Sequence, residues 1–127
     1  MEDSQRQLKT LSVPIHYQKE TCFQWWKRLC CQFTSYEYYY IRWSSKLSRF
    51  RKTNLSSGMV VVRLKVTHKG EIIDMCIDDE IAGLGLEEYM IRKITPLYSR
   101  LWIQLPYESP LLPFYRSCKV YIHIIGS

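Results

Sequence analysis

The sequence predicts one α+β domain with the element order α-β-β-α-β. Two runs of alternating apolar and polar residues meet at a short turn within 58–78, which is typical of a β-hairpin. Aromatic residues recur at helical spacing over 35–52, and a β-branched run closes the chain at 119–125. With 127 residues, 46% of them hydrophobic, the chain is long enough for one modest core. We expect the domain to occupy 34–127, after a leader over 1–33.

The positive charge is concentrated in the first part of the chain. The net charge is +6, and residues 1–52 hold ten Lys or Arg against four Asp or Glu, whereas residues 53–127 hold eight against eight. A basic region of this kind serves nucleic acid, an anionic lipid surface or an acidic protein face, and a solvated basic helix explains it equally well. Composition alone leaves these alternatives open.

The leader combines a polar stretch with an amphipathic segment. Residues 1–21 carry scattered charges of both signs, which predicts poor order. Cys22–Phe33 interleaves aromatic, basic and cysteine residues, a composition that suits a membrane interface and S-acylation. The candidate membrane contacts are Trp25, Trp26, Lys27 and Arg28. Packing of these rings over one end of the core is an equally good interpretation.

An amphipathic helix is predicted over Ser35–Lys52. Its apolar seam recurs at alternating steps of four and three residues, at Tyr36, Tyr40, Trp43, Leu47 and Phe50. Ser35 is a suitable N-cap. Cations near the far end of the helix are favoured by the partial negative charge of its unpaired carbonyls. The candidate basic patch of this helix is Arg42, Lys46, Arg49, Arg51 and Lys52.

An antiparallel hairpin is predicted next. In its first strand Val60, Val62, Leu64 and Val66 alternate with a wetter set, Val61, Arg63, Lys65 and Thr67. In its second strand we expect Ile73, Met75 and Ile77 inside and Asp74, Cys76 and Asp78 outside. The Lys69-Gly70 pair suits a tight turn, because glycine accepts a positive φ at little cost.

A second helix and a third strand complete the predicted domain. Leu86, Met90, Ile94 and Leu97 form an apolar stripe, and Pro96 disfavours helical geometry at Thr95. Three prolines then predict an extended crossover over Leu101–Phe114. Lys119–Ile125 is rich in β-branched and aromatic residues and should form the last strand.

No group of residues predicts catalysis or a metal site. The acidic run Asp78-Asp79-Glu80 lacks the loop and partner ligands of a cation site, and His16, His68 and His123 are scattered. The five cysteines, Cys22, Cys30, Cys31, Cys76 and Cys118, lack the paired spacing of disulfide or zinc frameworks, so we expect mostly free thiols. The sequence therefore predicts a binding protein without a cofactor rather than an enzyme.

From Tyr36 to Ile125 the chain resembles the C-terminal domain of the TonB and TolA energy-transducing proteins of Gram-negative envelopes. The matching features are the aromatic helix, the alternating strand from Gly58 to Val66, the Gly70 turn, an acidic loop, a helix with a Leu-Glu-Glu start and a closing apolar strand. The resemblance implies a three-stranded antiparallel sheet of order 2-1-3, with two helices on one face. It also implies that the last strand is an edge.

The resemblance implies a function in protein–protein interaction. Family members capture a segment of an outer-membrane receptor or periplasmic protein by adding it to an edge strand, as part of an envelope transport machine. The candidate partner-binding residues are Val120, Tyr121, Ile122, His123 and Ile124. Pairing of two such edges into a homodimer, and contact with a membrane surface, are further options.

The sequence gives conflicting indications of the compartment. The resemblance implies the periplasmic side of the inner membrane, whereas these residues contain neither a secretory signal nor an apolar run of the roughly 18–20 residues that span a bilayer. A preceding anchor, a tether through Cys22–Phe33 and a cytoplasmic location stay open as alternatives.

Nucleic-acid binding is the main competing function. Tyr38, Tyr39, Tyr40, Trp43, Arg42 and Lys46 have the composition of a surface that stacks on bases and contacts phosphates. On a helix, however, half of these rings would lie on the stripe that the core needs. We therefore do not expect nucleic acid to be the partner.

Overall fold

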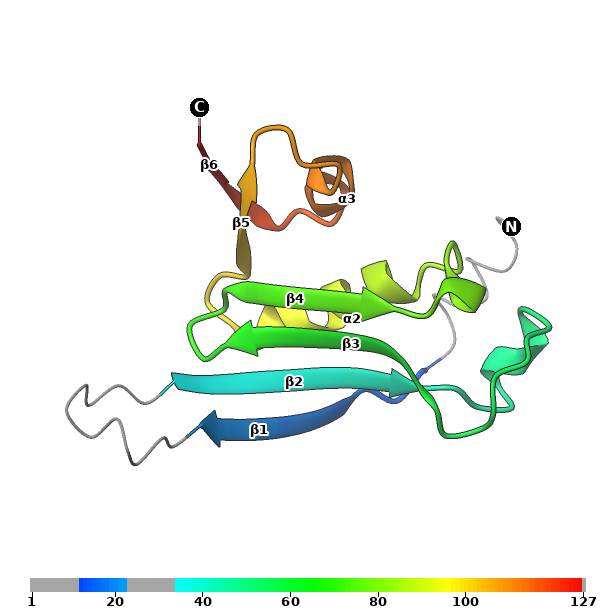
Figure 1. The fold of residues 1–127 in the computed structure, drawn as a ribbon. Coiled ribbons are helices and arrows are strands. Elements are labelled where there is room, and N and C mark those ends of the chain that lie inside the picture. Colours follow the sequence, from blue (N-terminus) through cyan, green and yellow to red (C-terminus); the bar gives the residue numbers. More distant parts are fainter. Residues whose placement is uncertain (1–11, 23–33, 127) are drawn as a thin grey trace.

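The computed structural model describes residues 12–22 and 34–126. A four-stranded antiparallel sheet has the order β1-β2-β3-β4, and a separate parallel pair joins β5 to β6 (Figure 1). The strands are β1 (His16–Cys22), β2 (Thr34–Arg42), β3 (Val60–Thr67), β4 (Ile72–Ile77), β5 (Trp102–Pro106) and β6 (Tyr121–Ile125). The helices are η2 (Leu47–Arg49), η3 (Asp79–Ile81), α2 (Leu86–Ile94), η4 (Thr95–Leu97) and α3 (Leu112–Ser117), where η marks a 3-10 helix.

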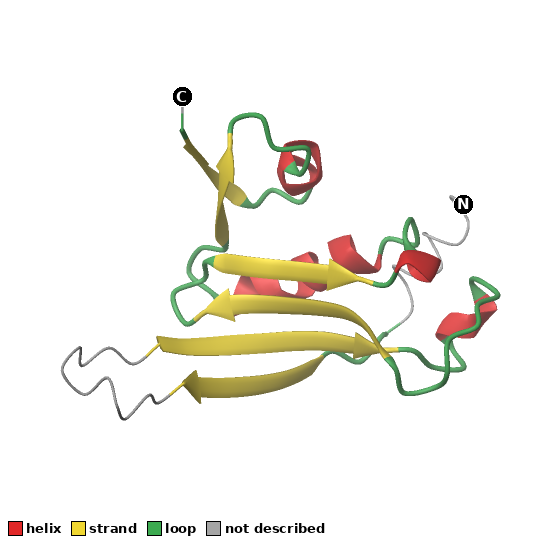
Figure 2. Ribbon diagram, in the orientation of Figure 1, coloured by secondary structure: helices red, strands yellow, loops and turns green. Residues whose placement is uncertain are grey.

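The α+β class is confirmed, but the predicted three-stranded sheet of order 2-1-3 is wrong. Helix α2 lies behind the four-stranded sheet in Figure 1, while β5, β6 and α3 lie beyond the β4 edge and contribute buried side chains to the same core. Strand β6 therefore belongs to the second sheet, and α3 packs beside β6 rather than on the main sheet. Figure 2 shows that most of the strand residues lie in the main sheet and that the helices are short.

The predicted hairpin is confirmed as β3 and β4. Val62, Leu64 and Val66 are fully buried, as the alternation predicts. The prediction is wrong at the start of the strand, where Val60 is exposed and Val61 is buried. The assignment of Ile73 to the inner face is wrong, because the register shifts at this point: Val66 pairs with Ile72, whereas Lys65 pairs with Asp74. The extra residue turns Ile73 outward, where it is exposed, and places Ile72 in the core.

The predicted helix over Ser35–Lys52 is wrong. Thr34–Arg42 forms strand β2, which pairs with β1 and β3, and the chain then turns into η2. The reason is that the segment also has a period of two: Tyr39, Ile41 and Trp43 are buried at alternate positions. Consecutive tyrosines favour a pleated strand over a helix, where their χ1 freedom is restricted.

The described part of the expected leader is ordered. Residues His16–Cys22 form β1, and Val13 is buried in the core, so the prediction of poor order is wrong for residues 12–21. The run Tyr-Gln-Lys-Glu-Thr has little apolar signal of its own, and it is held as an edge strand by pairing with β2. The predicted amphipathic segment over 23–33, with Trp25, Trp26, Lys27 and Arg28, lies outside the described residues.

Helix α2 is confirmed and supplies much of the core. Leu86, Met90, Ile91 and Ile94 are fully buried between the helix and the sheet. The chain continues from Ile94 through η4, in which Pro96 lies within the first turn, and the predicted fourth stripe residue, Leu97, is 64% exposed. Glu88 and Arg92, four residues apart on α2, form an ion pair at 2.7 Å.

The predicted extended crossover over Leu101–Phe114 is wrong. It contains β5 and the start of α3, and Leu101, Ile103 and Leu105 are buried. Pro113 lies in the first turn of α3, where its missing N–H leaves no helical hydrogen bond unmade. Helix α3 is the crossover that lets β6 return parallel to β5.

Candidate functional site

Strand β6 has a paired edge and a free edge. The Tyr121 N–H donates to the Leu101 carbonyl at 3.2 Å, so the backbone groups of Tyr121, His123 and Ile125 face β5. Alternation along a strand then directs the N–H and C=O groups of Ile122 and Ile124 away from β5. Within residues 12–22 and 34–126, no strand pairs with this outer edge.

The side chains of β6 are apolar and largely exposed. Tyr121, Ile124 and Ile125 have exposed fractions of 52%, 43% and 40%, and Ile122 is partly buried against the core. His123 is also exposed, and the Arg100 guanidinium lies 4.7 Å from the centre of the Tyr121 ring. Val120 is different: it is buried, and its N–H donates to the Tyr115 carbonyl of α3. Of the five predicted partner-binding residues, the last four therefore lie on β6 and Val120 lies in the core.

A second exposed surface lies on the face of the main sheet opposite α2. Residues that face each other across strands share a face, and the pairs Tyr38–Lys65 and Tyr40–Arg63 are opposite the buried pairs of β2 and β3. We call this surface, with Tyr36 and Arg42 at its ends, the tyrosine face. A shallow hollow of about 370 Å³ between Gln18, Tyr40 and Arg63 lies within it.

Cations lie over the rings of the tyrosine face. The Lys65 Nζ is 4.2 Å from the Tyr36 ring centre and 5.8 Å from the Tyr38 centre. The Arg42 guanidinium is 5.2 Å from the Tyr40 centre, and the His16 ring stacks on Tyr40 at the same centre-to-centre distance. Sequence reasoning missed this surface because it placed these rings on a helix, although the alternation of Tyr36, Tyr38 and Tyr40 was visible.

The residues of the predicted basic patch lie on different elements. Arg42 ends β2 and donates to the Gly58 carbonyl at 2.6 Å, while Lys46 precedes η2, Arg49 is its last residue, and both are exposed. Arg51 reaches the loop after β4, where its guanidinium donates to the Glu80 carbonyl at 3.0 Å and the Ala82 carbonyl at 2.6 Å. Lys52 is exposed in the loop that follows η2. Arg51 is thus a structural cation that closes two loops on each other.

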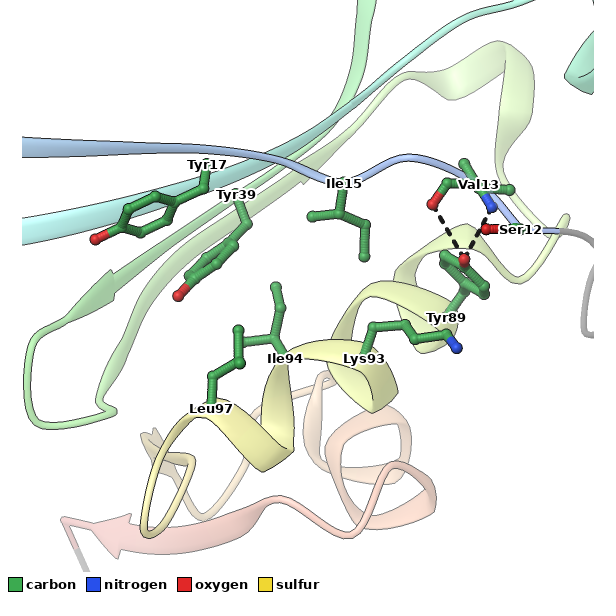
Figure 3. A pocket seen from close by; sticks show the side chains of 9 residues that line it. All are labelled: Ser12, Val13, Ile15, Tyr17, Tyr39, Tyr89, Lys93, Ile94 and Leu97. Carbon is green, nitrogen blue, oxygen red and sulfur yellow. Dashed lines mark hydrogen bonds between the residues drawn. The ribbon is translucent and has the colours of Figure 1, made fainter.

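A pocket of about 540 Å³ opens between β1, β2 and α2 (Figure 3). Its walls are aliphatic, from Val13, Ile15, Ile94 and Leu97, and aromatic, from three tyrosine rings. Figure 3 shows Lys93, Ser12 and Tyr89 at one end and the rings of Tyr17 and Tyr39 at the other. We call it the Lys93 pocket; no pattern in the sequence predicted it, because its walls come from three separate segments.

A hydrogen-bond network lies beside the tyrosine end of the pocket. The hydroxyls of Tyr17 and Tyr98 both donate to the Glu37 carboxylate, the first at 2.9 Å. Because the Tyr98 proton is directed to Glu37, the Tyr39 hydroxyl is the donor in its 2.9 Å hydrogen bond to Tyr98. Burial, followed by the hydrogen bond to Glu37, raises the pKa of Tyr98 far above its ordinary value, and burial also raises the pKa of Tyr39. The hydrogen bond to Glu37 raises the pKa of Tyr17.

The acidic run after β4 has a structural role. The Asp78 side chain accepts a hydrogen bond from the Glu80 N–H at 2.9 Å and caps η3. In the described residues no cluster of three or more His, Cys, Asp or Glu is arranged to hold a metal ion. Cys76 and Cys118 are free thiols, as predicted. None of the helices in the described ranges has the length and apolar character needed to cross a membrane.

No protein-family model, curated protein or solved structure matches this chain, so its function has to be argued from its own surfaces.

Proposed function

We propose that this domain is a non-catalytic docking module that binds an extended polypeptide by β-strand addition to the free edge of β6. The observation that carries the proposal is the combination of an unpaired strand edge with exposed apolar side chains. Exposed apolar edges promote association with other chains, and soluble proteins usually shorten, charge or cover them. An edge left in this state is suited to a partner strand.

The outward backbone groups define how the partner would be held. Ile122 and Ile124 offer two N–H donors and two carbonyl acceptors, which an added strand would pair in the usual ladder. Tyr121, His123 and Ile125 alternate with them and would contact the side chains of the partner. Backbone pairing would supply affinity, and these side chains would supply selectivity.

The envelope setting is a separate part of the proposal and rests on sequence resemblance. The hairpin β3–β4 and the following helix resemble those of the TonB and TolA C-terminal domains, whose members capture partner segments by strand addition. The strand order in this fold differs from the one that the resemblance implied. We propose a partner segment from an outer-membrane receptor or a periplasmic protein, on the periplasmic side of the inner membrane.

The test uses peptides selected on the full-length chain from a random peptide library. We expect the selected peptides to shift the amide resonances of 121–125, and Ile124→Pro to abolish their binding because it removes one outward N–H. The matched control, His123→Pro, removes an N–H that faces β5, so it should loosen the β5–β6 pair and show as a lower melting temperature. Selected peptides that bind Ile124→Pro with unchanged affinity, or that shift resonances elsewhere, would exclude the β6 edge.

A second candidate function is the binding of single-stranded nucleic acid on the tyrosine face. The observation that favours it is the row of half-buried Tyr36, Tyr38 and Tyr40 on the sheet face opposite α2, with Lys65 and Arg42 beside the rings. Bases stack on such rings, and the cations would contact phosphates. Two acidic residues are placed on this face by the strand pairing: Glu20 of β1 is opposite Tyr36, and Asp74 of β4 is opposite Lys65.

Fluorescence anisotropy with a twelve-nucleotide oligothymidylate tests this second candidate. Tyr38→Leu should weaken binding about tenfold, because base stacking on one ring contributes roughly 1–3 kcal/mol. Affinity should also fall steeply with salt concentration. Tyr107→Leu is the control, since Tyr107 is exposed in the loop after β5. Equal affinities of the two variants, or no dependence on salt, would eliminate the tyrosine face as a nucleic-acid site.

A further inference from the structure

The Lys93 pocket has the size and lining of a small-molecule site. Its volume of about 540 Å³ lies within the range of roughly 300–1,000 Å³ that is usual for ligand pockets. Tyr39, Tyr89 and Ile94 form a floor that is nearly inaccessible to solvent, whereas Leu97 and Tyr17 leave 64% and 50% of their surface exposed at the rim. An apolar rim around an apolar cavity leaves hydrophobic surface that a ligand would cover.

The two ends of the pocket differ in the polar groups that they offer to a ligand. At the tyrosine end, the Tyr17 and Tyr39 hydroxyls already donate to Glu37 and Tyr98, so they offer no free proton to a ligand. The negative charge of Glu37 on that side would repel an anion. That end therefore suits the apolar part of a ligand, which would lie against the ring faces.

The opposite end carries a cation, the Lys93 ammonium. Lys93 has no carboxylate within ion-pair distance in the described residues, and the neighbouring Arg92 is the residue paired with Glu88. The nearest described partner of the Lys93 ammonium is the Tyr89 ring, 5.7 Å from its centre. Ser12 lies at the same end of the pocket (Figure 3).

From this arrangement we infer that the Lys93 pocket binds a small amphipathic carboxylate, with its head group at Lys93 and its hydrocarbon body between Ile15, Ile94 and Leu97. A linear medium-chain carboxylate meets both requirements: it carries one negative charge at one end and a flexible apolar chain behind it. The opposite polarity is disfavoured, because a cationic head would face Lys93. This site is separate from β6 and from the tyrosine face, so it is independent of the proposed docking function.

The experiment titrates the full-length protein with decanoate, decan-1-ol and decyltrimethylammonium and follows the methyl resonances of Ile15, Ile94 and Leu97 by NMR. We expect saturable shifts with decanoate at submillimolar concentration, weaker shifts with the alcohol and the weakest with the cation. Absence of saturable shifts with decanoate up to 1 mM, or equal affinity for all three compounds, would overturn the inference.

Two variants separate the head group from the body of the ligand. Lys93→Met should weaken decanoate about three- to tenfold and leave decan-1-ol unchanged, because only the charged contact is lost. Leu97→Ser should weaken both compounds, and the high exposure of Leu97 makes loss of the fold by this change easy to exclude from the melting temperature. Lys69→Met, on the β3–β4 turn, controls for a general loss of positive charge. Equal effects of Lys93→Met and Lys69→Met would show that decanoate follows net charge and not the pocket.

Discussion

Tyr89 and Val13 are 76 residues apart in the chain, and the Tyr89 side chain forms hydrogen bonds with both the N–H and the carbonyl of Val13. The Tyr89 hydroxyl accepts a hydrogen bond from the Val13 N–H at 2.9 Å and donates one to the Val13 carbonyl at 3.1 Å. Both hydrogen bonds are buried. This relationship attaches the segment before β1 to α2 and forms the Lys93 end of the pocket.

Tyr89→Phe should therefore lower the free energy of unfolding by about 2 kcal/mol, because a buried N–H and a buried carbonyl lose their partner. Urea unfolding measures this change. Tyr107→Phe removes a hydroxyl from an exposed ring and should leave the stability within about 0.5 kcal/mol of the native value. Equal stabilities for Tyr89→Phe and the native protein would mean that water replaces the hydroxyl.

Gly70→Ala should destabilise the protein more than Gly58→Ala. Both glycines have a positive φ, +95° and +94°, which costs an alanine about 1–2 kcal/mol. A Cβ at Gly58 would meet nothing, whereas a Cβ at Gly70 would collide with the Arg100 carbonyl oxygen. The collision would also displace the Gly70 carbonyl, which accepts a hydrogen bond from the Trp102 N–H at 2.9 Å. Unfolding free energies of the two variants, and amide exchange at Trp102, check this prediction. Equal unfolding free energies for Gly70→Ala and Gly58→Ala would show that the loop around Arg100 moves to make room for the added methyl group.

The stability of the protein should fall as the pH rises above about 10. Burial and the hydrogen bond to Glu37 raise the pKa of Tyr98 in the folded state above its ordinary value of 10.0. Above that pH the unfolded chain loses the phenolic proton while the folded chain keeps it, so proton release favours unfolding. Below pH 10 this contribution to stability is fully present. The free energy of unfolding between pH 8 and 11 measures it, and Tyr98→Phe should show a shallower decline than the native protein; parallel curves would contradict the assignment to Tyr98.

The Lys65 ammonium and the Tyr36 ring should stabilise each other measurably. A cation over a ring at an exposed site contributes about 0.5–1 kcal/mol. The Lys65 Nζ lies 4.2 Å from the centre of the Tyr36 ring. A double-mutant cycle with Lys65→Gln and Tyr36→Leu isolates the interaction from the propensity changes of each substitution. A coupling energy indistinguishable from zero would show that the two side chains are independent in solution.

The elements that could be predicted from the sequence are those whose local pattern admits one interpretation. The β3–β4 hairpin has alternating apolar residues along Val62–Val66 and a glycine turn, and α2 has an apolar stripe with an acidic start and a basic end. Segment 34–52 fits two patterns at once, because Trp43 and Leu47 are apolar positions in both, and pairing with β1 and β3 adds to the strand preference of its tyrosines. Local sequence contains no information on that pairing.

The prediction near the C-terminus was wrong because of how the prolines were interpreted. Pro106 is the last residue of β5 and Pro113 lies in the first turn of α3, both of which are positions where a proline costs little. Each was taken as a break, so two elements were missed. The exposed edge of β6 was expected, although it belongs to a different sheet, whereas the Lys93 pocket depends on contacts between segments that no spacing reveals.

The order of the main sheet has a consequence for how the chain reaches this fold. Every strand of the sheet pairs with its neighbour in sequence, so each step closes one hairpin loop at low entropic cost. The parallel β5–β6 pair can form only after α3 brings its two strands together. The Tyr89–Val13 contact joins the segment before β1 to α2. Synthesis from the N-terminus thus favours early assembly of the meander. The β6 edge, where we propose that the partner docks, depends on α3, so we expect it to form after the meander.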